Sequence, residues 1–249
     1  MGVEFKQAEK LERLRQRGRS WLRKPLLQLC LRGAGAMLLG FILAGASAGG
    51  MFLPLSVALS AALGLSLPTF TAYLGGCVGY ILFWGLGEAM EPMAAGLLVV
   101  AASCVFDDVL TKQKQWFGTV SAMLFTGVVG FLFLVDNSFA VSAVWRWALR
   151  VLTAGAATRS YRKALEGSSM DRLLLMVSVC MGMCAIKPWG GMALGAVAAG
   201  ALSAAAMPSA LALPAAALCG LAVELSWMPG GATAILMAAT LLCREQRGR

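Results

Sequence analysis

Histidine is absent from this chain of 249 residues, and charged residues make up only 13% of it. Without histidine the chain lacks the side chain that most often serves as a general base near neutral pH. The sequence also contains no Gly-x-x-x-x-Gly-Lys-Ser/Thr loop of the kind that cradles nucleotide phosphates. These absences exclude the common hydrolytic and nucleotide-dependent enzymes, and we predict no catalytic residue in this chain.

Acidic residues are equally sparse, and Asp107 and Asp108 form the only adjacent acidic pair. Paired carboxylates can hold a divalent cation. Here the pair stands beside Lys112 and Lys114, so we interpret it as a helix terminus, with metal binding as the alternative. We therefore predict no metal site and no cofactor in this chain.

Apolar residues dominate the sequence instead, at 59%. A soluble domain of this size would carry about twice the observed charged fraction. If each bilayer crossing takes about 20 residues, the chain could supply about ten crossings. We predict an all-α, polytopic integral membrane protein with ten segments: Leu31–Ala48, Phe52–Leu65, Phe70–Leu86, Met93–Phe106, Phe117–Val135, Phe139–Ala157, Leu173–Ile186, Gly190–Ala206, Leu211–Leu225 and Ala232–Cys243.

The signs of the loop charges predict how these segments are oriented, because cytoplasmic loops collect Lys and Arg. With the N-terminus inside, the basic loops all fall on the cytoplasmic side, and Glu88, Glu91, Asp136 and Glu224 fall outside with Lys187 as the one basic residue there. Both termini are therefore predicted to be cytoplasmic. The three parts are a basic arm (1–30), a transmembrane domain (31–243) and a short tail (244–249).

The formal net charge of +9 does not indicate a nucleic-acid partner. The cations border apolar segments and do not cluster on a folded domain with stacking aromatics. Eight of the 21 lie in the basic arm, which we predict to lie on an anionic lipid leaflet as an amphipathic helix. The alternative is a solvated arm that only enforces topology. The predicted lipid contacts are Arg13, Arg15, Arg17, Arg19, Arg23 and Lys24.

Small residues give the second pattern within the apolar segments. Pairs of glycines spaced by four line one face of a helix and allow two helix backbones to approach closely. The pairs are Gly45 with Gly49, Gly75 with Gly79, and Gly191 with Gly195. They predict tight helix packing and self-association, and they indicate no activity.

Arg146 and Arg150 stand one helical turn apart within the segment Phe139–Ala157. A charge at mid-depth in a bilayer costs at least about 2.5 kcal/mol, so a partner is expected. One interpretation is a contact with an anionic ligand, or an ion pair with Glu88, Glu91 or Glu224. The other is a segment that starts later and is tilted, so that Arg150 extends to the inner surface.

Several stretches resemble the N-terminal membrane region of the stage II sporulation protein E family. They are the basic arm, GAGAMLLGF at 33–41, GGMFLPLSVA at 49–58, GGMALGAVAAG at 190–200 and LCGL at 218–221. The resemblance extends from about Arg32 to Leu242. It implies a ten-helix membrane anchor in the bacterial plasma membrane, located at the division septum, where the family associates with the tubulin-like division protein.

In that family the anchor precedes a PP2C-type serine phosphatase domain, which uses Mn or Mg. No residue here matches its metal-binding aspartates, so the chain is either the membrane part of a longer protein or a relative without the enzyme. Two functions are therefore predicted. The first is a membrane anchor and targeting module for a cytoplasmic effector. The alternative is a small-solute transporter or substrate-binding membrane component that uses Arg146 and Arg150.

Overall fold

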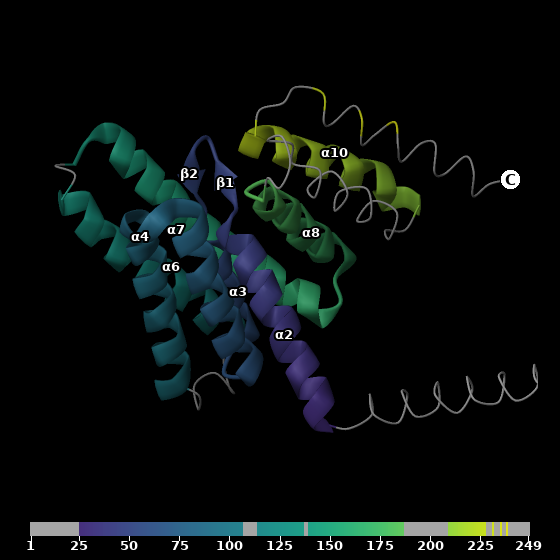
Figure 1. The fold of residues 1–249 in the computed structure, drawn as a ribbon, viewed down its shortest axis with the longest axis horizontal. Helices are drawn as coiled ribbons and strands as arrows, with labels where there is room; N and C mark the ends of the chain where they lie inside the picture. The colour runs from purple at the N-terminus through teal and green to yellow at the C-terminus, as the bar shows by residue number, and fades with distance from the viewer. Residues whose placement is uncertain are drawn as a thin grey trace, which may run out of the picture.

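The computed structural model describes residues 25–106, 114–136, 139–186 and 209–227, together with the single positions 231, 235 and 238. Nearly all of this part of the chain is helical, so the prediction of an all-α chain is confirmed for it. Its elements are α2 (Pro25–Ala44), β1 (Ser47–Ala48), β2 (Met51–Phe52), α3 (Leu55–Leu63), α4 (Leu67–Val105), α6 (Lys114–Asp136), α7 (Val141–Glu166), α8 (Ser169–Met183) and α10 (Ser209–Trp227). In Figure 1, α3, α4 and α6 lie on one side of α2, α8 and α10 lie on the other, and α7 passes behind α2 to reach the start of α8.

The second predicted segment, Phe52–Leu65, is corrected by the structure. The chain leaves α2 into a small antiparallel hairpin in which Ser47 pairs with Phe52, and α3 then has only nine residues. Nine residues of helix span about 14 Å, which is half of a bilayer core. Leu55 to Ala62 are all buried, so α3 is a short helix enclosed by its neighbours and not a full crossing.

A break at Gly85 divides α4 into two halves. Gly85 has φ 72° and ψ 168°, a conformation that glycine adopts without strain. The halves, 67–84 and 86–105, are about 27 and 30 Å long. They pack side by side, since the Tyr73 hydroxyl donates to the Met93 carbonyl oxygen (3.3 Å). The predicted segments Phe70–Leu86 and Met93–Phe106 are therefore two helices, but Glu88 and Glu91 belong to the second helix and not to a loop.

α6 and α7 form an antiparallel pair. Near the turn between them, Phe131 contacts Phe139 with ring centroids 5.9 Å apart. At the other end, a Cβ on Gly118 would lie 3.6 Å from Thr158 Cγ2. The segment predicted as Phe139–Ala157 begins at Val141 and continues to Glu166, where Gly167 ends it with φ 112°. Its charged C-terminal part is thus helical and not a loop.

Close backbone contacts explain several of the predicted packing glycines. A Cβ on Gly75 would fall on the Met37 carbonyl, and one on Gly79 would lie 2.6 Å from the Phe41 carbonyl oxygen, so both glycines let α4 pack directly on α2. Gly45 is equally close to α8, with the Gly182 carbonyl oxygen at 2.8 Å. Gly49 is corrected: it lies in the β1–β2 turn with φ 57°, and a Cβ there would meet nothing within 4 Å. Gly191 and Gly195 lie outside the described residues.

The exposed face of α6 is apolar. On α6 the exposed large side chains recur every three or four residues, which places them on one helical face. They are Trp116, Val120, Leu124, Val128, Phe131, Leu132 and Val135. Within the described ranges, two helical stretches are long and apolar enough to cross a membrane: Leu67–Val105 and Trp116–Val135. A continuous apolar face of this kind is typical of contact with lipid.

Candidate functional site

An ion pair joins α7 to the second half of α4. Arg150 Nη1 donates to Glu91 Oε2 at 2.6 Å. The Arg150 side chain is 17% exposed and the Glu91 side chain 10%, so both charges are largely removed from solvent. A charge-assisted contact this short is among the stronger hydrogen bonds in proteins. The two opposite charges thus neutralise one another between packed helices.

An aromatic ring completes the environment of Arg150. The guanidinium carbon lies 3.8 Å from the centroid of the Phe52 ring, a cation–π contact with the end of the β1–β2 hairpin. The Nε of Arg150 is buried and has no hydrogen-bond partner among the described residues. Arg150 therefore links three parts of the fold, and one of its donors remains unused.

Two backbone features place Glu91 beside Arg150. The break at Gly85 turns the chain back, and Glu91 follows it by six residues, on the helix that faces α6 and α7. Gly130 on α6 then leaves room for the carboxylate: a Cβ there would lie 3.0 Å from Glu91 Oε1 and 2.8 Å from Trp147 Cδ1. Trp147 is held in turn by its Nε1–H, which donates to the Gly127 carbonyl oxygen (3.0 Å).

A cavity of about 260 Å³ adjoins the pair between α4, α6 and α7. Its charged lining consists of two acids and two cations: Glu88, Glu91, Arg146 and Arg150. Arg146 differs from Arg150 because it is exposed and its Nε donates to the Ser142 carbonyl oxygen of its own helix (3.2 Å). The cavity therefore has formally balanced charge, with Arg146 and Glu88 as its more accessible groups.

The sequence identified the two arginines but not their different surroundings. Of the three acids considered as partners, Glu91 pairs with Arg150, Glu88 lines the cavity, and Glu224 accepts a hydrogen bond from the Gly231 N–H (3.2 Å). Sequence analysis missed Phe52, Gly130 and Trp147. A tryptophan in the middle of an apolar segment was a usable signal for the last, because its N–H needs a partner when buried.

The sequence also contains a serine motif whose structural surroundings differ from those that the motif requires. Residues 45–49 read Gly-Ala-Ser-Ala-Gly, the spacing of a Gly-x-Ser-x-Gly nucleophile elbow, which requires a turn from a sheet strand into a helix. Here Ser47 follows a helix and starts the two-residue strand β1. Its carbonyl oxygen accepts from the Ser226 hydroxyl of α10 (2.8 Å). The context is that of a packing turn.

Other predicted contacts cannot be placed. The basic arm residues Arg13, Arg15, Arg17, Arg19, Arg23 and Lys24 lie outside the described part of the chain. Within the described part, no group of three or more Cys, Asp or Glu side chains is arranged to hold a metal ion.

None of the comparisons with protein-family models, curated proteins or solved structures gives a match for this chain. The resemblance to the stage II sporulation protein E family therefore stays a prediction that depends on the stretches quoted above.

Proposed function

We propose that this chain is a multi-pass membrane domain that anchors and targets a cytoplasmic effector. One observation carries the proposal: α6 has an exposed apolar face, and an ion pair is enclosed between the helices beside it. The α6 face from Trp116 to Val135 is exposed and apolar, whereas Arg150 and Glu91 are paired between helices. That arrangement suits lipid around the helices, since intramembrane charges normally face the interior of a bundle and pair with one another.

Ten crossings with both termini in the cytoplasm are part of this proposal. The antiparallel halves of α4 and the antiparallel α6–α7 pair support it, because successive helices then run in alternate directions. The side chains at the predicted inner end also support it. Arg159, Arg162 and Lys163 all lie near the end of α7 that adjoins the start of α6, as expected for a cytoplasmic boundary.

From the family resemblance alone, we also propose that the chain is targeted to the division septum of a bacterial cell. There it would self-associate and bind the tubulin-like division protein. Any Mn- or Mg-dependent phosphatase activity would belong to a separate cytoplasmic domain. The paired state of Arg150 agrees with an anchor, because its charge is already neutralised by Glu91 within the chain.

Localisation of the full chain fused to a fluorescent protein tests the anchor function in dividing bacterial cells. The informative variant is the double substitution Glu91→Leu and Arg150→Leu, which removes both charges together and leaves neither unpaired. We expect the variant to remain in the membrane and to keep the wild-type distribution. A diffuse cytoplasmic signal for the wild-type chain, or loss of targeting in a stably inserted double variant, would contradict the proposal.

A solute-binding function is the second candidate, and the cavity of about 260 Å³ beside Arg146 favours it. Uptake of a panel of small anions into proteoliposomes tests it. Arg146→Leu should abolish uptake if Arg146 contacts the solute, whereas Arg32→Leu, which removes an exposed cation on α2, should not. Equal flux in protein-free and protein-containing vesicles would exclude transport of these anions.

A further inference from the structure

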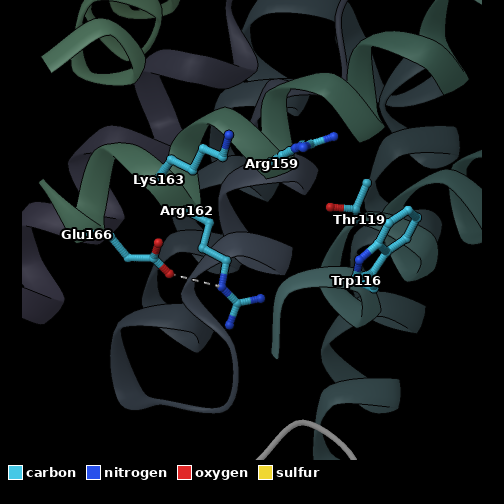
Figure 2. A pocket seen from close by; sticks show the side chains of 6 residues that line it. All are labelled: Trp116, Thr119, Arg159, Arg162, Lys163 and Glu166. Atoms are coloured by element: carbon cyan, nitrogen blue, oxygen red, sulfur yellow. Dashed lines mark ion pairs between the residues drawn. The ribbon is translucent and has the colours of Figure 1, made fainter. Parts of the chain in front are cut away.

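A second cluster of charge lies at the other end of the α6–α7 pair, away from the Arg150 ion pair. It surrounds a cavity of about 80 Å³ lined by six side chains: Trp116 and Thr119 from α6, and Arg159, Arg162, Lys163 and Glu166 from α7. In Figure 2, Arg159 extends from α7 towards the side on which Thr119 and Trp116 of α6 lie, whereas Arg162 extends downwards from α7. One water needs about 10–15 Å³ of such space, so the cavity admits a tetrahedral phosphate group.

The charges around this cavity are not balanced within the described part of the chain. Three cations face one acid, and the contact between them is long: Arg162 Nε lies 3.8 Å from Glu166 Oε1. The rest of the Arg162 guanidinium is directed away from Glu166 in Figure 2, and its side chain is 16% exposed. A guanidinium whose terminal nitrogens are directed away from its neighbouring carboxylate has the geometry that binds phosphate oxygens in pairs.

The position of the cavity indicates where the phosphate comes from. Trp116 is 72% exposed and stands at the first position of the apolar face of α6, which continues through Val120 and Leu124. Tryptophan at the end of an apolar helical face is typical of the headgroup region of a bilayer. A phosphate bound here would lie at headgroup depth, and acyl chains could follow the apolar face of α6.

We propose that this cavity binds the phosphate of an anionic lipid headgroup in the cytoplasmic leaflet. Arg159 and Arg162 hold the phosphate oxygens, Thr119 donates its hydroxyl, and Trp116 covers the glycerol side. Basic pockets between helices on the cytoplasmic side suit such headgroups. The inference depends on the membrane location proposed above but not on the anchor function. It concerns a site other than the predicted contacts of the N-terminal arm.

Native mass spectrometry of the full chain in detergent tests the proposal with dioleoyl phosphatidylglycerol, dioleoyl phosphatidylcholine and inorganic phosphate as separate probes. We expect retention of phosphatidylglycerol only. Arg159→Gln with Arg162→Gln should weaken retention by about fivefold for each cation removed. The matched control is Arg32→Gln, which removes an exposed cation of α2 and should leave retention unchanged. Circular dichroism and a single size-exclusion peak establish that each variant is folded.

Glu166→Gln provides a test in the opposite direction. It removes the one acid of the cavity and should strengthen retention of phosphatidylglycerol, so the proposal can be judged even if the double variant does not fold. Equal losses in Arg32→Gln and in the cavity variants would overturn the site, because binding would then follow net charge alone. Inorganic phosphate that binds with the same dependence on the variants, without lipid retention, would overturn the lipid as its source. A chain that stays soluble without detergent would instead contradict the membrane location.

Discussion

At the scale of single residues, Arg150 and Arg146 illustrate how one helical turn separates two different roles. Arg150 is directed into the fold, where Glu91 and the Phe52 ring contact it. Arg146 is exposed and bonds to the backbone of its own helix. Identical side chains four residues apart therefore contribute differently. The first is expected to determine stability, and the second is available to a ligand.

Substitutions in the Arg150–Glu91 ion pair should have large and non-additive effects on stability. Arg150→Leu should lower the free energy of unfolding by about 3–5 kcal/mol, because it leaves Glu91 buried without its partner. Glu91→Leu should have a similar effect for the same reason. The double variant should be more stable than either single variant, since two apolar side chains can replace a buried pair at little cost. Thermal unfolding in detergent measures all four proteins.

Arg146→Leu is the matched control for these four proteins, and it should change the melting temperature little. If the two single effects simply add in the double variant, the 2.6 Å contact does not couple Arg150 to Glu91. The interpretation of the pair as a structural link would then be wrong.

At the scale of elements, glycine determines how closely the helices pack. α2 and the first half of α4 touch backbone to backbone at Gly75, where a Cβ would fall on the Met37 carbonyl. No side-chain movement can relieve a contact with a backbone carbonyl. The interface between these two helices therefore has no room for a methyl group at Gly75.

Gly75→Ala should separate α2 from α4 and destabilise the chain by about 1–3 kcal/mol, the range of overpacked cores. Gly35→Ala is the control on α2, since a Cβ there meets nothing within 4 Å. It should be neutral or stabilising, because alanine favours helix by up to about 1 kcal/mol over glycine. Melting temperatures in detergent compare the two. Equal effects would show that the close contact at Gly75 is not what limits packing.

The elements also show what the sequence could predict. Long apolar runs and loop charges located α6 and the first half of α4 to within three residues at each end. The start of the second half was predicted wrongly at Met93, because Glu88 and Glu91 indicated a loop and instead lie in the helix. The shortness of α3 was not predictable in this way. Its residues are as apolar as those of a crossing helix, and only the hairpin at Ser47–Phe52 and the enclosing helices limit its length.

The candidate sites were predictable only in part. An arginine in an apolar segment is costly without a partner, and the sequence offered Glu88, Glu91 and Glu224 as acids that could pair with it. An anionic ligand and a tilted segment were the other interpretations. Which of these acids meets Arg150 depends on the turn at Gly85. The residues next to Gly85 do not indicate that the chain turns there. The cluster at Arg159, Arg162 and Lys163 was interpreted as a loop charge because its gathering against Trp116 depends on how α6 and α7 pair.

At the scale of the whole molecule, the length of α7 indicates that its two ends lie on opposite sides of the proposed membrane. Ala140 precedes this helix and Ser169 follows it, and both are exposed. The 26 residues between Val141 and Glu166 span about 39 Å, more than the apolar thickness of a bilayer. The two positions should therefore differ in access from outside the cell.

Cysteine labelling checks this topology. In a variant whose native cysteines are replaced, Ala140→Cys should react with a membrane-impermeant maleimide in intact cells. Ser169→Cys should react only after the membrane is permeabilised. Labelling of both positions in intact cells, or of neither, would show that α7 does not cross the bilayer with its basic end inside. Western blots of each variant control for expression.

The Arg150–Glu91 contact also has a consequence for biogenesis. The two residues are 59 positions apart, and synthesis proceeds from the N-terminus, so in the membrane location proposed above Glu91 would enter the bilayer well before its partner is made. During that interval the second half of α4 carries an unmatched acid, and only the arrival of α7 removes the mismatch. On that proposal, insertion of α4 would be coupled to that of α7, and a chain truncated before α7 would keep an unpaired acid between its helices.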